Sequence, residues 1–202
     1  MAASSTKERL LKSAQTLMLA NGYKATSVDQ ICNAAGLSKG SFYHFFDGKE
    51  VLGLAVLRFS LEEHAEALSS DSLATVADPI QRALAYVDHL VEQSPMLWSQ
   101  GCLLGSFSLE LAETNPRMQA QVSSLFSEIT DGFAAILEPV ARQHGSTDGP
   151  TARELAEQLL ACLEGSIVLA KAHADWRRIP TGIRQFRGYL KLLLETAPAL
   201  NG

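Results

Sequence analysis

A run of small, basic and aromatic residues near the N-terminus has the chemistry needed to contact DNA. Lys39, Gly40 and Ser41 are small or basic, and Tyr43 and His44 follow them with polar tips. Side chains of these types can hydrogen-bond to base edges or phosphate oxygens when a helix carries them into the major groove. We therefore expect all five residues to lie at a DNA-reading surface.

Four residues beside this run are expected to position the phosphate backbone. Ser27 and Ser38 each stand where a helix would begin, Thr26 precedes Ser27, and Lys49 lies in the first turn of a later helix. Helix N-termini carry partial positive charge and unpaired N–H groups, which favour phosphate. Phosphate contacts are therefore predicted from Thr26, Ser27, Ser38 and Lys49.

Two short helices joined by a tight turn would hold these residues in place. The spacing of apolar residues predicts a helix over residues 28–35, which Ser27 and Gln30 begin as a capping box and Gly36 can end. A second helix is predicted over residues 39–44. This is the helix-turn-helix pattern, in which the second helix enters the major groove.

Residues 5–55 resemble the DNA-binding domain of TetR/AcrR-type transcriptional repressors. The resemblance is carried by the text ATSV at 25–28, Ile31, AAGLSKGSFYHFF at 34–46 and KEVL at 49–52. It implies an all-α homodimer with two domains. The DNA-binding domain would span residues 1–50 and the ligand-binding and dimerisation domain residues 51–202, and a small molecule would release the DNA.

Helical patterns also account for the rest of the chain. Asp78-Pro79 and Asn115-Pro116 are caps followed by proline, and Thr151 with Glu154 is a second capping box. The further helices are expected over about 6–21, 48–68, 79–94, 101–111, 116–142, 151–174 and 181–196. Pro95 is expected to end the helix over 79–94, and residues 69–75 are expected to form a polar break. No pattern of period two persists, so the prediction is an all-α fold of about nine helices.

Charge is unevenly distributed along the chain, whose net charge is −5. Residues 1–50 carry six Lys/Arg and four Asp/Glu, and the remainder carries eleven and eighteen, which gives +2 and −7. A local basic face suffices for DNA binding, whereas the acidic remainder argues against nucleic acid wrapping the whole molecule. No stretch reaches the ~18 uncharged apolar residues of a membrane span, and the N-terminus lacks the apolar region of a signal peptide. We expect a cytoplasmic protein with no membrane partner.

Catalysis has little support in the sequence. None of the five histidines belongs to a recognisable motif, and there is no Walker loop, GxGxxG or HExxH. The three cysteines are widely separated and lack metal-ligand spacing. We expect no enzyme, no cofactor and no metal. A helical enzyme and an interaction protein that does not bind DNA are the weaker alternatives.

The resemblance places an effector pocket inside the C-terminal domain, among the fifth to eighth of the expected helices, which span about residues 79–174. Candidate lining residues are the Met, aromatic and Cys residues of that region, although each of them taken singly could be ordinary core. They are Met96, Trp98, Cys102, Phe107, Phe126, Phe133 and Cys162. As a set they predict a small and mostly apolar effector.

Cys102 also supports an alternative, a repressor that senses electrophiles or oxidants. It stands at the start of a predicted helix, where the macrodipole favours the thiolate. Some members of the resembled family use a cysteine of this domain in that way. Simple packing is the competing interpretation of the same thiol.

The last two helices are expected to form a homodimer interface, because their apolar faces look too wide for one small domain to cover. Paired with their symmetry mates they would form a four-helix bundle. The interface prediction comprises Leu155, Leu159, Leu163, Ile167, Ile183, Phe186, Leu190 and Leu193. A two-fold dimer would bind a pseudo-palindromic operator with half-sites about 34–36 Å apart.

Overall fold

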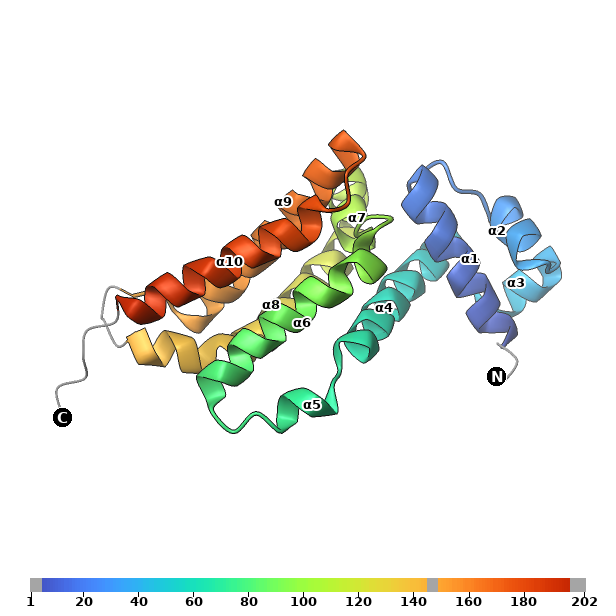
Figure 1. Ribbon diagram of the computed structural model, residues 1–202. Helices are drawn as coiled ribbons and strands as arrows, with labels where there is room; N and C mark the ends of the chain where they lie inside the picture. The colour runs from blue at the N-terminus through green and yellow to red at the C-terminus, as the bar shows by residue number, and fades with distance from the viewer. Residues whose placement is uncertain (1–4, 145–148, 197–202) are drawn as a thin grey trace. The chain divides into compact units, whose positions relative to one another are not determined.

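The computed structural model describes residues 5–144 and 149–196, and within these ranges the chain forms helices and no strand (Figure 1). The helices are α1 (Thr6–Asn21), α2 (Val28–Ala35), α3 (Lys39–Phe45), α4 (Lys49–Leu68), α5 (Asp71–Ala74), α6 (Pro79–Trp98), α7 (Leu103–Leu111), α8 (Pro116–His144), α9 (Ala152–His173) and α10 (Arg178–Glu195). The prediction of an all-α fold is therefore confirmed. The short helix α5 falls within the expected polar break.

The contacts divide the chain into two compact units. One comprises residues 1–65 and 100–126, and the other comprises residues 66–99 and 127–202. This division differs from a single cut after residue 50. The reason is that α7 and the start of α8 belong with α1 to α4, although they are distant from them in sequence.

The first unit is built around the apolar faces of α1, α2 and α3. Its fully buried side chains include Leu10, Met18, Ile31 and Phe42. The expected capping box of α2 has both of its hydrogen bonds, and Gly36 ends that helix in the left-handed region at φ 62°. Local sequence signals therefore fix α2 and α3 in the helix-turn-helix arrangement.

Pro95 does not end its helix, contrary to the sequence-based expectation. It lies inside α6, which continues to Trp98. Because proline has no N–H, Pro95 cannot donate the usual helical hydrogen bond to the carbonyl of Val91, four residues earlier. The Ser94 hydroxyl instead donates a 2.9 Å hydrogen bond to the Val91 carbonyl, so the helix tolerates the proline.

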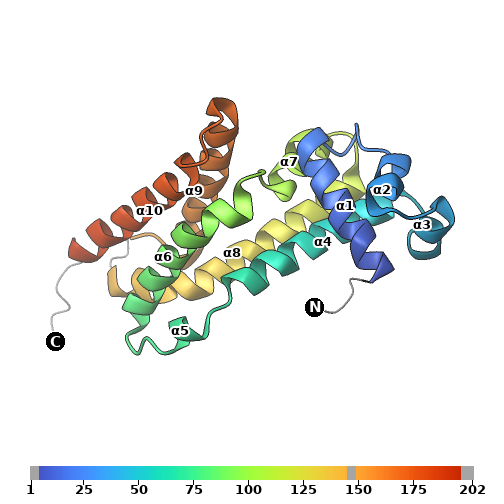
Figure 2. The same ribbon diagram turned by 45° about the vertical axis from the view of Figure 1, so that its right-hand side comes forward.

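The second unit buries the apolar faces of its last two helices within one chain, because α10 packs against both α9 and α6 (Figures 1 and 2). All eight residues predicted for the dimer interface lie in this core, at most 8% exposed: Leu155, Leu159, Leu163, Ile167, Ile183, Phe186, Leu190 and Leu193. The premise that one domain could not cover them was wrong. The sequence-based argument did not foresee α6 as the covering element.

Candidate DNA-binding surface

The exposed side of α3, together with the N-cap of α2, forms the candidate DNA-binding surface. Ser38 caps α3 by accepting the amide of Ser41 at 3.1 Å, and the Phe42 side chain anchors the helix in the core. The exposed residues that this leaves facing outward are Ser27, Ser38, Lys39, Gly40, Tyr43 and His44, and Ser41 is half-buried. Seven of the nine predicted contacts are therefore accessible to a DNA duplex.

Lys39 on this surface forms an ion pair with Asp29 of α2. The Lys39 Nζ lies 2.7 Å from Asp29 Oδ1, and both side chains are 61% exposed. The hydrogen bond to Asp29 raises the pKa of Lys39, and the attraction of the two charges adds to it. An exposed pair of this kind is weak because water screens both charges, so an acceptor atom of a DNA base or phosphate can replace the carboxylate.

The structure does not support the predicted phosphate contact from the Thr26 side chain. Thr26 is buried, and its hydroxyl donates a 2.7 Å hydrogen bond to the carbonyl of Gly22. The side chain closes the connection between α1 and α2 instead of facing solvent. Sequence reasoning placed it at the surface because it directly precedes an N-cap.

Lys49 is also used within the protein. Its Nζ donates to the carbonyls of Tyr23 at 3.0 Å, Lys24 at 3.3 Å and Thr26 at 3.0 Å, and lies 4.5 Å from the centre of the Tyr23 ring. An ammonium group has three N–H donors, and each has a carbonyl acceptor here. Lys49 thus has an intramolecular role in this structure, and its phosphate contact stays a prediction.

Glu110 of α7 contacts the same connection, and no sequence signal pointed to it. Its Oε2 accepts the amide of Tyr23 at 2.8 Å, and its Oε1 accepts the amide of Lys24 at 2.6 Å. The Lys24 ammonium donates to the Glu110 carbonyl at 3.0 Å. The partners are separated by 86 and 87 residues, so a search for local motifs cannot find the contact.

The seven predicted effector-binding residues are divided between the two units. Cys102, Phe107 and Phe126 belong to the first unit, and the others belong to the second. Phe107, Trp98 and Phe133 are core residues, and Met96 is 65% exposed. Cys102, Phe126 and Cys162 are half-buried.

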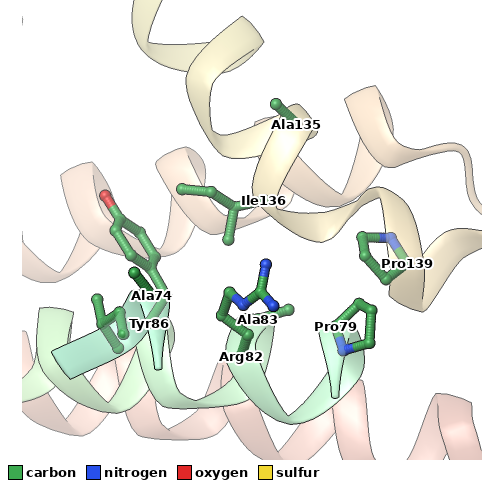
Figure 3. A pocket seen from close by; sticks show the side chains of 9 residues that line it. Ala74, Pro79, Arg82, Ala83, Tyr86, Ala135, Ile136 and Pro139 are labelled. Carbon is green, nitrogen blue, oxygen red and sulfur yellow. The ribbon is translucent and has the colours of Figure 1, made fainter. Parts of the chain in front are cut away.

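A pocket of about 300 Å³ lies in the second unit between α5, α6 and α8 (Figure 3). None of the predicted effector residues lines it. Its walls are Leu73, Ala74, Pro79, Arg82, Ala83, Tyr86, Ala135, Ile136 and Pro139. Figure 3 shows Arg82 and Tyr86 on the α6 side, with Ile136 facing them from α8. The volume is at the small end of the range for ligand pockets, about 300–1,000 Å³.

Two side chains, Arg82 and Tyr86, give this largely apolar pocket hydrogen-bonding capacity. The Arg82 guanidinium is held in place by the carbonyls of Val76 at 2.8 Å and Ala77 at 3.3 Å. Burial raises the pKa of Tyr86 to about 12, so its phenol is neutral at physiological pH. The pocket thus has the polar groups of Arg82 and Tyr86 beside its apolar walls.

Within residues 5–144 and 149–196, no group of three or more His, Cys, Asp or Glu side chains is arranged to hold a metal ion. None of the helices in these ranges is both long enough and apolar enough to span a bilayer.

Comparison with known proteins gives matches over most of the chain. Residues 10–56 match the model for bacterial regulatory proteins of the tetR family, and residues 76–180 match the LmrA/YxaF-like transcriptional regulator C-terminal domain. The transcriptional repressor DhaR of Mycobacterium sp. (strain GP1) is 30% identical over 162 residues, which are 80% of this chain and 77% of DhaR.

Solved structures agree with this fold. Reduced Escherichia coli NemR superposes with a TM-score of 0.74 at 24% identity, over 97% of this chain and 100% of that one. A TetR transcriptional regulator from Chloroflexus aurantiacus gives a TM-score of 0.77 at 24% identity, over 92% and 94% of the two chains. At these identities the structural likeness concerns the fold alone.

Proposed function

The chain belongs to the TetR family of bacterial transcriptional repressors, and we propose that it binds a pseudo-palindromic operator as a homodimer that a small, mostly apolar effector releases. The observation that carries this proposal is the exposed surface of α3. Lys39, Tyr43 and His44 project from a helix whose opposite side is anchored by the buried Phe42. The protein would act in the cytoplasm and without catalysis.

Footprinting on DNA that flanks the protein's own gene tests the operator proposal. The purified protein should protect two half-sites about one helical turn, roughly 34–36 Å, apart. Lys39→Ala and Ser41→Ala should change the preferred operator sequence, because base contacts carry sequence choice. Absence of protection on every flanking region would remove the support for operator binding.

The homodimer is proposed to form through the outward faces of α9 and α10, in place of the eight core residues. The large apolar side chains exposed there are Val168, Leu169, Tyr189 and Leu192. Gly165 and Gly188 have no neighbour within 4 Å of an added Cβ, which leaves room for a second backbone. Two-fold pairing of both helices would cover these side chains in a four-helix bundle.

The effector is proposed to bind in the pocket between α5, α6 and α8. Its body would be apolar and compact, and a hydrogen-bonding head group would meet Arg82 and Tyr86. Ala135→Phe should fill the pocket from an exposed position. This variant should bind the operator and ignore any molecule that releases the wild type in gel shifts. A variant that still responds would place the effector elsewhere.

Cys102 favours a second candidate function, repression controlled by thiol modification. Its Sγ accepts the amide of Gly105 at 3.4 Å at the N-terminus of α7, and E. coli NemR, a structural relative, is known in a reduced form. Cys102→Ser should bind operator DNA but ignore electrophiles. Cys32 serves as the control thiol, because burial, and then the nearby Asp29, raises its pKa. Equal reaction rates of the two thiols would dismiss this candidate.

A further inference from the structure

We propose that Glu110 and Lys49 are positioning residues for DNA binding, which fix the connection of residues 22–26 between α1 and α2. The proposal rests on the proposed repressor function. The two side chains have opposite charges and hold complementary backbone groups. Glu110 accepts the amides of Tyr23 and Lys24, whereas Lys49 donates to three carbonyls of the same connection.

The Tyr23 side chain holds the centre of this connection in place. Its ring is buried, packs edge-on against Phe107 of α7 at 5.2 Å between centroids, and lies under the Lys49 ammonium. A Cβ added at Gly53 of α4 would stand 2.9 Å from Tyr23 Cε2, so only glycine leaves room for the ring. Both the backbone and the side chain of the connection are therefore restrained by α4 and α7.

The connection in turn determines where α2 begins. The hydroxyl of Thr26 closes it back to the Gly22 carbonyl, and Ser27 then caps α2. Because α2 packs against both α1 and α3, a shift of residues 22–26 would displace Ser27 and the exposed residues of α3. Two charged groups outside α2 and α3 would thus control the orientation of the DNA-binding surface.

Glu110→Ala tests the contact from α7. Hydrogen exchange of the full-length protein should show faster exchange of the Tyr23 and Lys24 amides, which lose their acceptor. Affinity for a DNA fragment that the wild type protects should fall about tenfold, the scale of a charge-assisted hydrogen bond. Glu110→Gln, which keeps one acceptor oxygen, should have an amide exchange rate and a DNA affinity between those of Glu110→Ala and those of the wild type. Glu113→Ala, an exposed acid just beyond α7, should change neither quantity.

Lys49→Met separates positioning from phosphate contact. Replacing a positioning residue lowers affinity but leaves the slope of log affinity against log salt unchanged. Replacing a lysine that binds phosphate instead lowers the magnitude of that slope by about 1. We expect an unchanged slope together with faster amide exchange in residues 22–26. A slope reduced by about 1 with unchanged exchange would overturn the role of Lys49. Unchanged affinity in Glu110→Ala would overturn the role of Glu110.

Amide exchange and DNA affinity, measured side by side, also separate this inference from the proposed function. If the wild type protects no DNA fragment, operator binding fails as the function. The exchange rates of the Tyr23 and Lys24 amides still decide whether Glu110 and Lys49 restrain the connection, and exchange equal to that of the wild type in both variants would overturn it.

Discussion

Gly182 of α10 faces Ser166 of α9 so closely that a Cβ on Gly182 would stand 1.9 Å from Ser166 Oγ. The hydroxyl cannot easily turn away, since it donates a 2.6 Å hydrogen bond to the Cys162 carbonyl. The Ser166 Cβ and the Cys162 carbonyl oxygen would also lie 3.1 Å and 3.5 Å from the added carbon. The packing of α9 on α10 therefore requires the absence of a side chain at position 182.

Gly182→Ala should lower the free energy of unfolding, measured in urea, by about 1–3 kcal/mol, because overpacking shifts a helix or a rotamer. The cost should be smaller in a Ser166→Ala background, where the nearest atom is gone. Gly132→Ala is the matched control, since its added Cβ has no neighbour within 4 Å. Gly132→Ala should raise the free energy of unfolding by roughly 0.5–1 kcal/mol, because alanine has a higher helix propensity than glycine. Equal effects at the two glycines would contradict the packing argument.

Asp29→Asn should strengthen DNA binding by up to about fivefold, because it releases Lys39 from an exposed ion pair that water screens and weakens. Fluorescence anisotropy with labelled duplex measures the change. Glu62→Gln alters the net charge equally at another exposed position and should have a smaller effect. A larger gain from Glu62→Gln would show that net charge, and not the release of Lys39, sets the affinity.

Leu192→Glu should convert the proposed dimer to a folded monomer that binds its operator poorly. Leu192 is 61% exposed on α10, so one chain tolerates the charge while a paired chain does not. Sedimentation equilibrium at micromolar concentration measures the change of mass. Leu163→Asp, in the core of one chain, should instead abolish the cooperative unfolding transition. A wild type that sediments as one chain would refute the dimer and with it the palindromic operator.

Stability should decline at alkaline pH through Tyr86. Burial raises its pKa from 10.0 in the unfolded chain to about 12 in the fold, so the folded state holds the phenolic proton more tightly. The stability that this proton provides is fully present below pH 10 and is lost as the pH rises towards 12. Tyr86→Phe should show a shallower decline in urea unfolding between these values. An identical pH profile would assign the decline to other groups.

Sequence alone predicted the helix-turn-helix because its signals are local. Ser27 with Gln30, Gly36, and Ser38 each act within four residues of chain, and each forms the cap that its residue type predicts. Their exposed neighbours on α3 are found in the same way. These features depend on hydrogen bonds between near neighbours, which a linear pattern records.

The missed features depend on contacts between distant segments. Lys49 was assigned to phosphate because an ammonium at a helix start suits an anion, but carbonyls from the α1–α2 connection occupy it. The apolar faces of α9 and α10 were correctly identified as needing cover. Which element covers them, α6 in the same chain or a second chain, is decided by packing that no sequence period encodes.

The bond between Tyr23 and Glu110 spans 87 residues, and this separation has a consequence during synthesis. While the ribosome is still making α5 and α6, the helices α1 to α3 have been synthesised but the carboxylate that receives the Tyr23 and Lys24 amides has not. The nascent chain can form local helices early, but long-range contacts are completed later. The proposed role of Glu110 therefore means that the DNA-binding surface reaches its final orientation only after residue 110 has been translated.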